Sequence, residues 1–211
     1  MSLFTALKLG VVASVLFCLV MLAVMVIRTF SFGRRPTYAH PQGSNFAGIV
    51  YAFGPGMLPW EKESAAKHIW TYVGGVLYHL GILIAMLYLA AFLLSIRLPT
   101  ILLQAVRILL VLGIASGVAL LIKRMLKPHM RIISGGDDYL ANILVDLLLF
   151  LALATSFAET VLVLFYVTAI IIFIYIPFGK LRHCVFFFYT RILFGDFFGR
   201  RGVIPHSSER A

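Results

Sequence analysis

Five apolar runs constrain the fold of this chain more than any other feature of its sequence. Each is close to the ~20 residues that a helix needs to cross the ~30 Å hydrocarbon core of a bilayer. Backbone N–H and C=O groups cannot stay unpaired in lipid, so such runs form helices. The sequence therefore predicts an all-α fold, a five-span transmembrane helix bundle forming a single membrane domain over residues 1–211. The predicted spans are residues 9–27, 69–94, 101–122, 139–157 and 160–178.

Composition supports the same class. Hydrophobic residues make up 62% of the chain and charged residues only 12%, and the mean hydropathy is +1.01. These values lie far outside the range of soluble globular domains. The first run has one lysine and no Ala-x-Ala-like end, so we interpret it as a retained span rather than a signal peptide. We expect a multi-pass protein of the cell inner (cytoplasmic) membrane.

The positive charges predict how the bundle is oriented. All but three of the 18 Lys and Arg residues fall after spans one, three and five. Cytoplasmic loops of membrane proteins collect such cations, so we expect the N-terminus outside and the C-terminus in the cytoplasm. The formal net charge of +10 is thus explained by topology, and we expect no nucleic-acid partner. The cations on the predicted inner side are Arg28, Arg34, Arg35, Lys62, Lys67, Lys123, Arg124, Lys127, Arg131, Lys180, Arg182, Arg191, Arg200, Arg201 and Arg210.

The sequence also predicts the local structure of the segments outside the spans. The inner loop over residues 29–67 is rich in Gly and Pro, so we expect no regular helix before Trp60. The tail over residues 185–211 mixes Phe, Tyr and Arg, which suits an interfacial helix or a docking strip for a soluble subunit. Residues 156–159 (Ser-Phe-Ala-Glu) predict a capping box at the start of span five. Residues 134–138 (Ser-Gly-Gly-Asp-Asp) predict a helix start with two carboxylates at its positive end.

Two histidines are candidate iron ligands. Ionisable groups within spans are costly and by default indicate function. His79 lies inside span two, and His183 lies where span five ends. Haem in membrane cytochromes b is held between imidazoles of different helices, and small residues let the macrocycle approach a helix. Gly75 is one turn before His79, on the same helix face, and leaves such space.

Depth is a test of this pairing. At 1.5 Å per residue, His79 lies roughly 22 Å below the outer end of span two, and His183 roughly 36 Å below that of span five. Tilt, a bend at Pro177 and Gly179, and helical continuation through residues 185–188 would absorb much of the difference. If the two histidines do not pair, a neutral histidine in lipid can instead hydrogen-bond across helices.

Three stretches in order resemble one family. They are residues 78–83 (Tyr-His-Leu-Gly-Ile-Leu), residues 121–128 (Leu-Ile-Lys-Arg-Met-Leu-Lys-Pro) with the following 131–138, and residues 176–183 (Ile-Pro-Phe-Gly-Lys-Leu-Arg-His). With the five-span pattern, the chain resembles the cytochrome b gamma subunit of respiratory nitrate reductase and related quinone-linked, heterodisulfide-reductase-like membrane subunits. The resemblance covers spans two to five.

The resemblance implies a haem b protein with one haem. Family members stack two b haems across the membrane, and His79 and His183 match the ligands of the inner one. The ligands of the outer haem would fall near Tyr88 and Leu89 on span two and near Phe165 and Tyr166 on span five, where no histidine stands. The chain therefore resembles a shortened form that retains the haem close to the cytoplasm.

Other groups complete the expected surroundings. Lys123 and Arg124 could neutralise haem propionates, although cations that snorkel at a span end are common. Arg107 is the cation nearest to the quinone-binding lysine of the family but does not align with it; Arg107 and Asp146 could also pair with each other. His68 lies about three turns before His79, and we interpret it as an interfacial anchor rather than a ligand of a second haem. We take the remaining histidines, His40, His129 and His206, as ordinary solvated residues.

These observations lead to one functional prediction and two rivals. The chain is expected to relay electrons between membrane quinone and a cytoplasmic iron–sulfur subunit that serves a catalytic subunit, as part of an oxidoreductase complex rather than a complete enzyme. A redox-inert anchor that recruits a cytoplasmic catalytic complex is the alternative. A small transporter would be expected to carry paired acidic residues at mid-membrane, and Asp146 alone supports this weakly.

Overall fold

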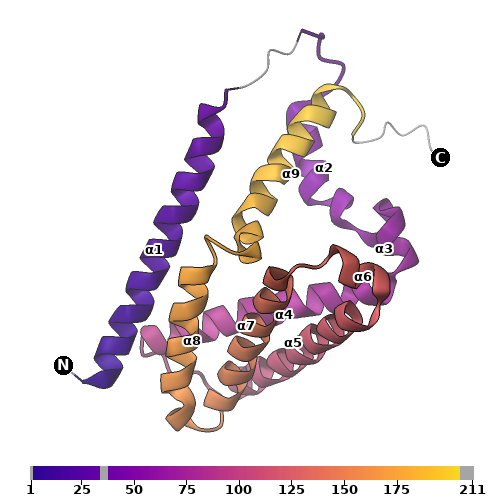
Figure 1. Cartoon of the computed structure of the whole chain (residues 1–211). Coiled ribbons are helices and arrows are strands. Elements are labelled where there is room, and N and C mark those ends of the chain that lie inside the picture. The colour runs from indigo at the N-terminus through magenta and orange to yellow at the C-terminus, as the bar shows by residue number, and fades with distance from the viewer. Residues whose placement is uncertain (1, 34–37, 205–211) are drawn as a thin grey trace. The chain divides into compact units, whose positions relative to one another are not determined.

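The computed structural model describes residues 2–33 and 38–204, and within these ranges the chain forms helices and no strands (Figure 1). The α-helices are α1 (Leu3–Ser31), α2 (Asn45–Phe53), α3 (Glu63–Lys67), α4 (Ile69–Leu93), α5 (Thr100–Leu126), α6 (Pro128–Ile133), α7 (Gly136–Thr155), α8 (Leu162–Tyr175) and α9 (His183–Arg200). Short 3₁₀ helices are η1 (Pro55–Met57), η2 (Pro59–Glu61), η3 (Glu159–Val161) and η4 (Lys180–Arg182). The predicted all-α class is confirmed.

Four helices, α1, α4, α5 and α7, are long and apolar enough to cross a membrane. A fifth candidate arises if Glu159–Tyr175 and Lys180–Arg200 are counted as one broken span. The chain thus has the character of a multi-pass membrane protein, with helices that extend beyond several predicted runs. The first, for example, covers Leu3–Ser31 rather than 9–27. The orientation of the termini stays a prediction.

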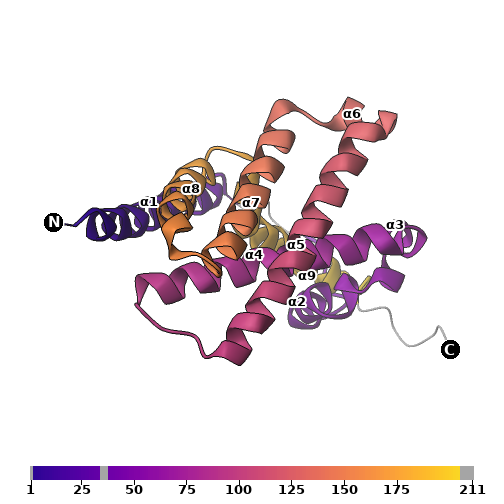
Figure 2. The same cartoon turned by 90° about the horizontal axis from the view of Figure 1, so that it is seen from below.

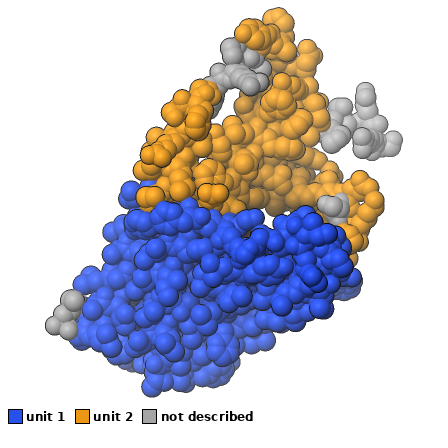
Figure 3. Space-filling view, viewed as in Figure 1, with its two compact units in different colours: residues 1–20, 70–181 blue, residues 21–69, 182–211 orange. Residues whose placement is uncertain are grey.

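The chain divides into two compact units, coloured separately in Figure 3. Unit 1 comprises residues 1–20 and 70–181, and unit 2 comprises residues 21–69 and 182–211. Helix α1 contributes to both. The single membrane domain stays a prediction.

Unit 1 has a core of apolar side chains from α1, α4, α5, α7 and α8. Phe165 and Tyr166 of α8 are fully buried, as are Leu110 of α5 and Leu149 of α7. Helices α4 and α5 approach backbone to backbone at a pair of glycines. A Cβ atom placed on Gly81 would lie 2.8 Å from Cα of Gly113, a distance that real Cβ contacts do not reach. Small residues at such crossings allow apolar helices to associate without a hydrophobic driving force.

Unit 2 is built around the pairing of α2 with α9, which lie side by side in Figures 1 and 2. The contact again depends on glycines, since a Cβ on Gly48 would meet the backbone of Gly195 and Gly199. Helix α2 begins at Ser44, whose hydroxyl accepts the N–H of Ala47 at 3.3 Å. The expectation of no regular helix before Trp60 is therefore wrong, because this cap and the packing on α9 stabilise a nine-residue helix.

Two further expectations fail for local reasons. Ser156 does not open a capping box: its hydroxyl donates to the carbonyl of Leu153 at 2.7 Å, so it closes α7. His68 does not continue the face of α4, because it caps α3 with φ −131° and ψ 49°, outside the helical region, and α4 begins after it. The interruption expected at Pro177 and Gly179 is confirmed, since α8 ends at Tyr175 and the next α-helix begins at His183.

The Gly81–Gly113 contact predicts a sharp difference between two glycines of the same helix. Gly81→Ala should lower the free energy of unfolding by about 1–3 kcal/mol, because α4 and α5 must separate to admit the methyl group. A Cβ on Gly74 meets nothing within 4 Å, so Gly74→Ala should leave stability unchanged or raise it through its better helix propensity. Thermal unfolding in detergent, followed by circular dichroism, compares the two variants. Equal stability of both would contradict the contact.

Candidate haem and intramembrane polar sites

His79 is positioned by the backbone of its own helix. Its Nδ1 atom lies 2.7 Å from the carbonyl oxygen of Gly75, one turn earlier on α4, and donates a hydrogen bond to it. The imidazole is exposed at the surface of the described chain. A histidine that binds a metal through Nε2 commonly donates its Nδ1–H to a backbone carbonyl, which fixes the ring and its tautomer. His79 has this arrangement.

The helix surface beside His79 carries no covering side chain. A Cβ on Gly75 would have no heavy atom of the described residues within 4 Å, apart from its own helix backbone and chain neighbours, and the same holds for Gly74. Because Gly75 precedes His79 by four residues, both lie on the same face of α4. A flat macrocycle could therefore lie against the helix backbone at this face.

His183 is the first residue of α9 and is also exposed. It belongs to unit 2, whereas His79 belongs to unit 1. Their pairing as iron ligands stays a prediction. The predicted depth of His183 assumed one continuous straight helix from the start of span five. That assumption does not hold, because α8 and α9 are separate helices.

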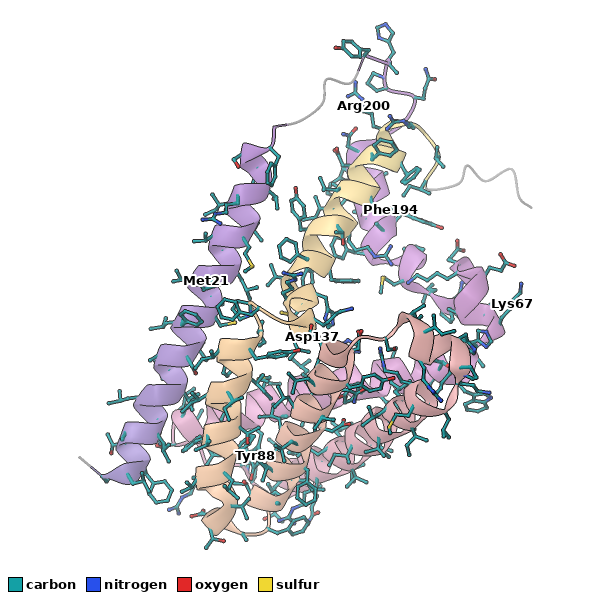
Figure 4. The ribbon with its side chains drawn as sticks, viewed as in Figure 1. Met21, Lys67, Tyr88, Asp137, Phe194 and Arg200 are labelled. Atoms are coloured by element: carbon teal, nitrogen blue, oxygen red, sulfur yellow. The ribbon has the colours of Figure 1, made fainter. Side chains whose placement is uncertain are left out.

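The four positions where a second haem would need ligands lie in the core of unit 1. Phe165 and Tyr166 are fully buried, and Tyr88 and Leu89 are 6% and 2% exposed. The ring of Tyr88, labelled in Figure 4, packs edge-on against Phe92 with centroids 4.9 Å apart. Packed apolar and aromatic side chains thus occupy these positions.

Lys123 and Arg124 lie at the end of α5 and have partners within unit 1. The Nζ atom of Lys123 donates to Oγ1 of Thr71 at 2.6 Å. Thr71, Gly75 and His79 follow one another at intervals of four residues on α4, so Lys123 reaches the same helix face as His79. Arg124 donates to Oγ of Ser134 at 3.1 Å and lies 3.4 Å from a carboxylate oxygen of Asp138.

The predicted acidic start of α7 is confirmed. The Asp138 carboxylate accepts the backbone N–H of Gly135 at 2.9 Å, which satisfies one of the free donors at the helix start. Lys180 donates its backbone N–H to Asp137 at 2.8 Å and its Nζ to Asp138 at 3.1 Å. Asp137, labelled in Figure 4, also accepts the hydroxyl of Tyr175. These contacts hold the segment after α8 against the start of α7.

Arg107 and Asp146 do not pair with each other. The Nε atom of Arg107 donates to Oγ of Ser156 at 3.0 Å, and Nη2 donates to the Ser156 carbonyl. Its guanidinium also lies 4.0 Å from the ring centroid of Phe157. This alternative is therefore wrong, because the turn after α7 supplies acceptors within reach of Arg107. A role for Arg107 toward quinone stays a prediction.

Sequence reasoning missed the actual partners of Asp146. Nδ2 of Asn142 donates to Oδ2 of Asp146 at 2.8 Å and to the hydroxyl oxygen of Tyr78 at 3.1 Å. Asn142 and Asp146 stand four residues apart in an otherwise apolar run, a spacing that predicts contact on one helix face. The Asn142–Asp146 contact could therefore have been predicted from this spacing. The contact of Tyr78 with Asn142 could not, because it depends on how α4 packs against α7.

Two pKa shifts lie in the α2–α3 segment of unit 2, and one of them involves α9. Burial lowers the pKa of Lys62, and the neighbouring Arg191 lowers it further. A hydrogen bond to Glu61 raises the pKa of Tyr51, with burial adding to the effect. Nη2 of Arg191 lies 2.7 Å from Sδ of Met57, and its guanidinium lies 5.7 Å from the Phe187 ring centroid. Part of the predicted tail is thus a helix packed on the inner loop; residues 205–211 lie outside the described ranges.

The other histidines within the described ranges belong to no group of metal-ligating side chains. His40 and His129 are exposed, and His206 lies outside the described ranges, as do Arg34, Arg35 and Arg210. Among the described residues, no group of three or more His, Cys, Asp or Glu side chains could hold a metal ion. Comparisons with protein-family models, with curated proteins and with solved structures find no match to this chain.

The acidic start of α7 yields a stability prediction. Asp138→Ala removes the acceptor for the Gly135 N–H and the partner of Lys180, and should cost about 1 kcal/mol of unfolding free energy. Glu159→Ala changes an exposed acid and is the matched control. Chemical denaturation in detergent measures both variants. Equal losses in the two would show that the contacts of Asp138 contribute nothing.

Proposed function

We propose that the chain is a haem b membrane subunit that relays electrons between the quinone pool and a cytoplasmic iron–sulfur subunit of a larger complex. The observation that carries the proposal is the geometry at His79. Its ring is oriented by the Gly75 carbonyl, 2.7 Å from Nδ1, and a Cβ on Gly75 would meet no heavy atom of the described residues within 4 Å outside its own helix.

The residues present fit the cofactor. His79 supplies an imidazole of the kind that binds haem iron, and His183 would be the second ligand. The Lys123 ammonium, held at Thr71 on the same face of α4, supplies a cation for a propionate. Arg124 is shared with Ser134 and Asp138, which makes it the weaker candidate of the two.

The chain's own residues set the conditions for electron transfer. When bound, haem supplies reversible one-electron exchange at its iron. His79 would hold the iron with a ring fixed by its hydrogen bond to Gly75, and the apolar helices would exclude water, which affects the reduction potential. The packed core at Tyr88, Leu89, Phe165 and Tyr166 supports a single haem rather than two.

The partners follow from charge and resemblance. The excess of cations on the predicted inner side suits a cytoplasmic subunit with an acidic surface, which we take to be the iron–sulfur subunit that serves a catalytic subunit. Quinone would exchange electrons from within the bilayer, with Arg107 as the candidate contact. The redox-inert anchor is the rival, because the hydrogen bond from His79 to Gly75 would also stabilise a histidine without haem.

A reduced-minus-oxidised visible spectrum of the purified full chain tests the proposal. We expect the α-band of a low-spin b haem in the unmodified protein and its loss in His79→Ala and in His183→Ala. His129→Ala, an exposed histidine of α6, should keep the full band. The absence of any α-band in the unmodified chain would leave the anchor as the better account.

The glycine beside His79 gives a second, independent test. Gly75→Leu should fold normally, because a Cβ there meets no described heavy atom within 4 Å outside its own helix, but it should lower haem content at least tenfold by filling the space proposed for the macrocycle. Gly74→Leu adds the same bulk on another face of α4, where a Cβ also meets no described heavy atom within 4 Å outside its own helix, and should retain haem. Haem content per chain and far-ultraviolet circular dichroism are measured for both. Full occupancy in Gly75→Leu would exclude this face as the binding surface.

A further inference from the structure

A carboxyl group lies between three helices inside unit 1. Asp146 stands roughly 15 Å along α7, a helix of 20 residues, and so near its middle. Its neighbours come from α4, α5 and α7, all of which are long and apolar enough to cross a membrane. An ionisable group at such a depth is a candidate functional site.

The two oxygens of this carboxyl group have different surroundings. Oδ2 accepts the hydrogen bond from Nδ2 of Asn142. Oδ1 is buried and accepts no hydrogen bond of normal geometry from the described residues. An ionised carboxylate is an acceptor at both oxygens, with about four lone-pair sites to satisfy. Even with the neighbouring Tyr78 hydroxyl counted beside Asn142, Asp146 has fewer donors than the about four lone-pair sites of its ionised form require.

No cation compensates for the missing donors. Among the described residues, no Lys, Arg or His side chain forms an ion pair with Asp146. Arg107 is bound to Ser156. From α5 the group in contact is Gly117, which carries no charge, and from α4 it is Tyr78, a neutral phenol. An isolated negative charge in such a place is strongly disfavoured.

The close packing leaves little room for another solution. A Cβ atom on Gly117 would collide with Oδ1 of Asp146 and with the ring of Tyr78. The carboxyl group thus lies directly against the backbone of α5. Tyr78 closes the other side, where its hydroxyl donates to the backbone carbonyl of Asn142 at 3.3 Å.

We propose that Asp146 binds a proton at neutral pH, so that Tyr78, Asn142 and Asp146 form a proton-binding site between α4, α5 and α7. The proton comes from water and forms an O–H bond at Oδ1, which removes the charge. Oδ2 remains the carbonyl oxygen that accepts the Asn142 amide. The site rests on unit 1 alone and holds whether or not haem is bound.

Infrared spectroscopy of the full chain in lipid nanodiscs tests the proposal directly. A protonated carboxyl group gives a C=O stretching band above the amide I region, which shifts to lower frequency in D₂O. We expect this band at neutral pH, its loss in Asp146→Asn, and its retention in Glu63→Gln, which alters an exposed acid. Absence of the band from the unmodified chain, or its survival in Asp146→Asn, would overturn the proposal.

A second variant keeps the test decisive if Asp146→Asn fails to fold. Asn142→Ala removes the donor to Oδ2 but leaves the acid in place. The C=O band should then move to higher frequency, because its oxygen has lost a hydrogen bond. An unmoved band would show that the protonated acid is not the one bound by Asn142, and the proposed site would be wrong.

Discussion

The backbones of α4 and α5 meet at Gly81 and Gly113, and this contact brings α4 against α5 within unit 1. Lipid chains are as apolar as leucine side chains, so apolar helices associate through close packing rather than through the hydrophobic effect. Gly81 and Gly113 allow this packing, and Gly117 one turn later lets the side chains of Tyr78 and Asp146 lie against α5. Unit 2 repeats the principle in the pairing of α2 with α9 through Gly48, Gly195 and Gly199.

Helix α4 uses glycine in two opposite ways. On its packed side, Gly81 is buried and brings α5 close. On another face, a Cβ on Gly75 would meet no heavy atom of the described residues within 4 Å outside its own helix, and Gly75 lies one turn from His79. Gly81 allows α4 and α5 to pack closely, whereas Gly75 leaves open space beside α4. This difference is why the haem proposal rests on Gly75 rather than on glycine content in general.

The charged groups of unit 1 are accommodated in different ways. Arg107 donates hydrogen bonds to the hydroxyl and carbonyl of Ser156 and lies over the ring of Phe157. Asp138 accepts a backbone N–H at the start of α7 and pairs with Lys180 and Arg124. Asp146 differs because it has an amide donor and no cation. Neutralisation by a proton is the simplest way to accommodate it beside apolar helices.

The sequence by itself determined the helical class, the approximate spans and the acidic start of α7, because hydrophobic run length and capping preferences are local properties. It also located His79 and Gly75 on one helix face, since that relation follows from helical periodicity. Only the tertiary structure decided that Ser156 accepts hydrogen bonds from Arg107 and that residues 45–53 form a helix packed on α9. It also decided that Tyr78 contacts Asn142 and Asp146. These outcomes depend on how segments distant in the sequence pack together, which local sequence patterns do not predict.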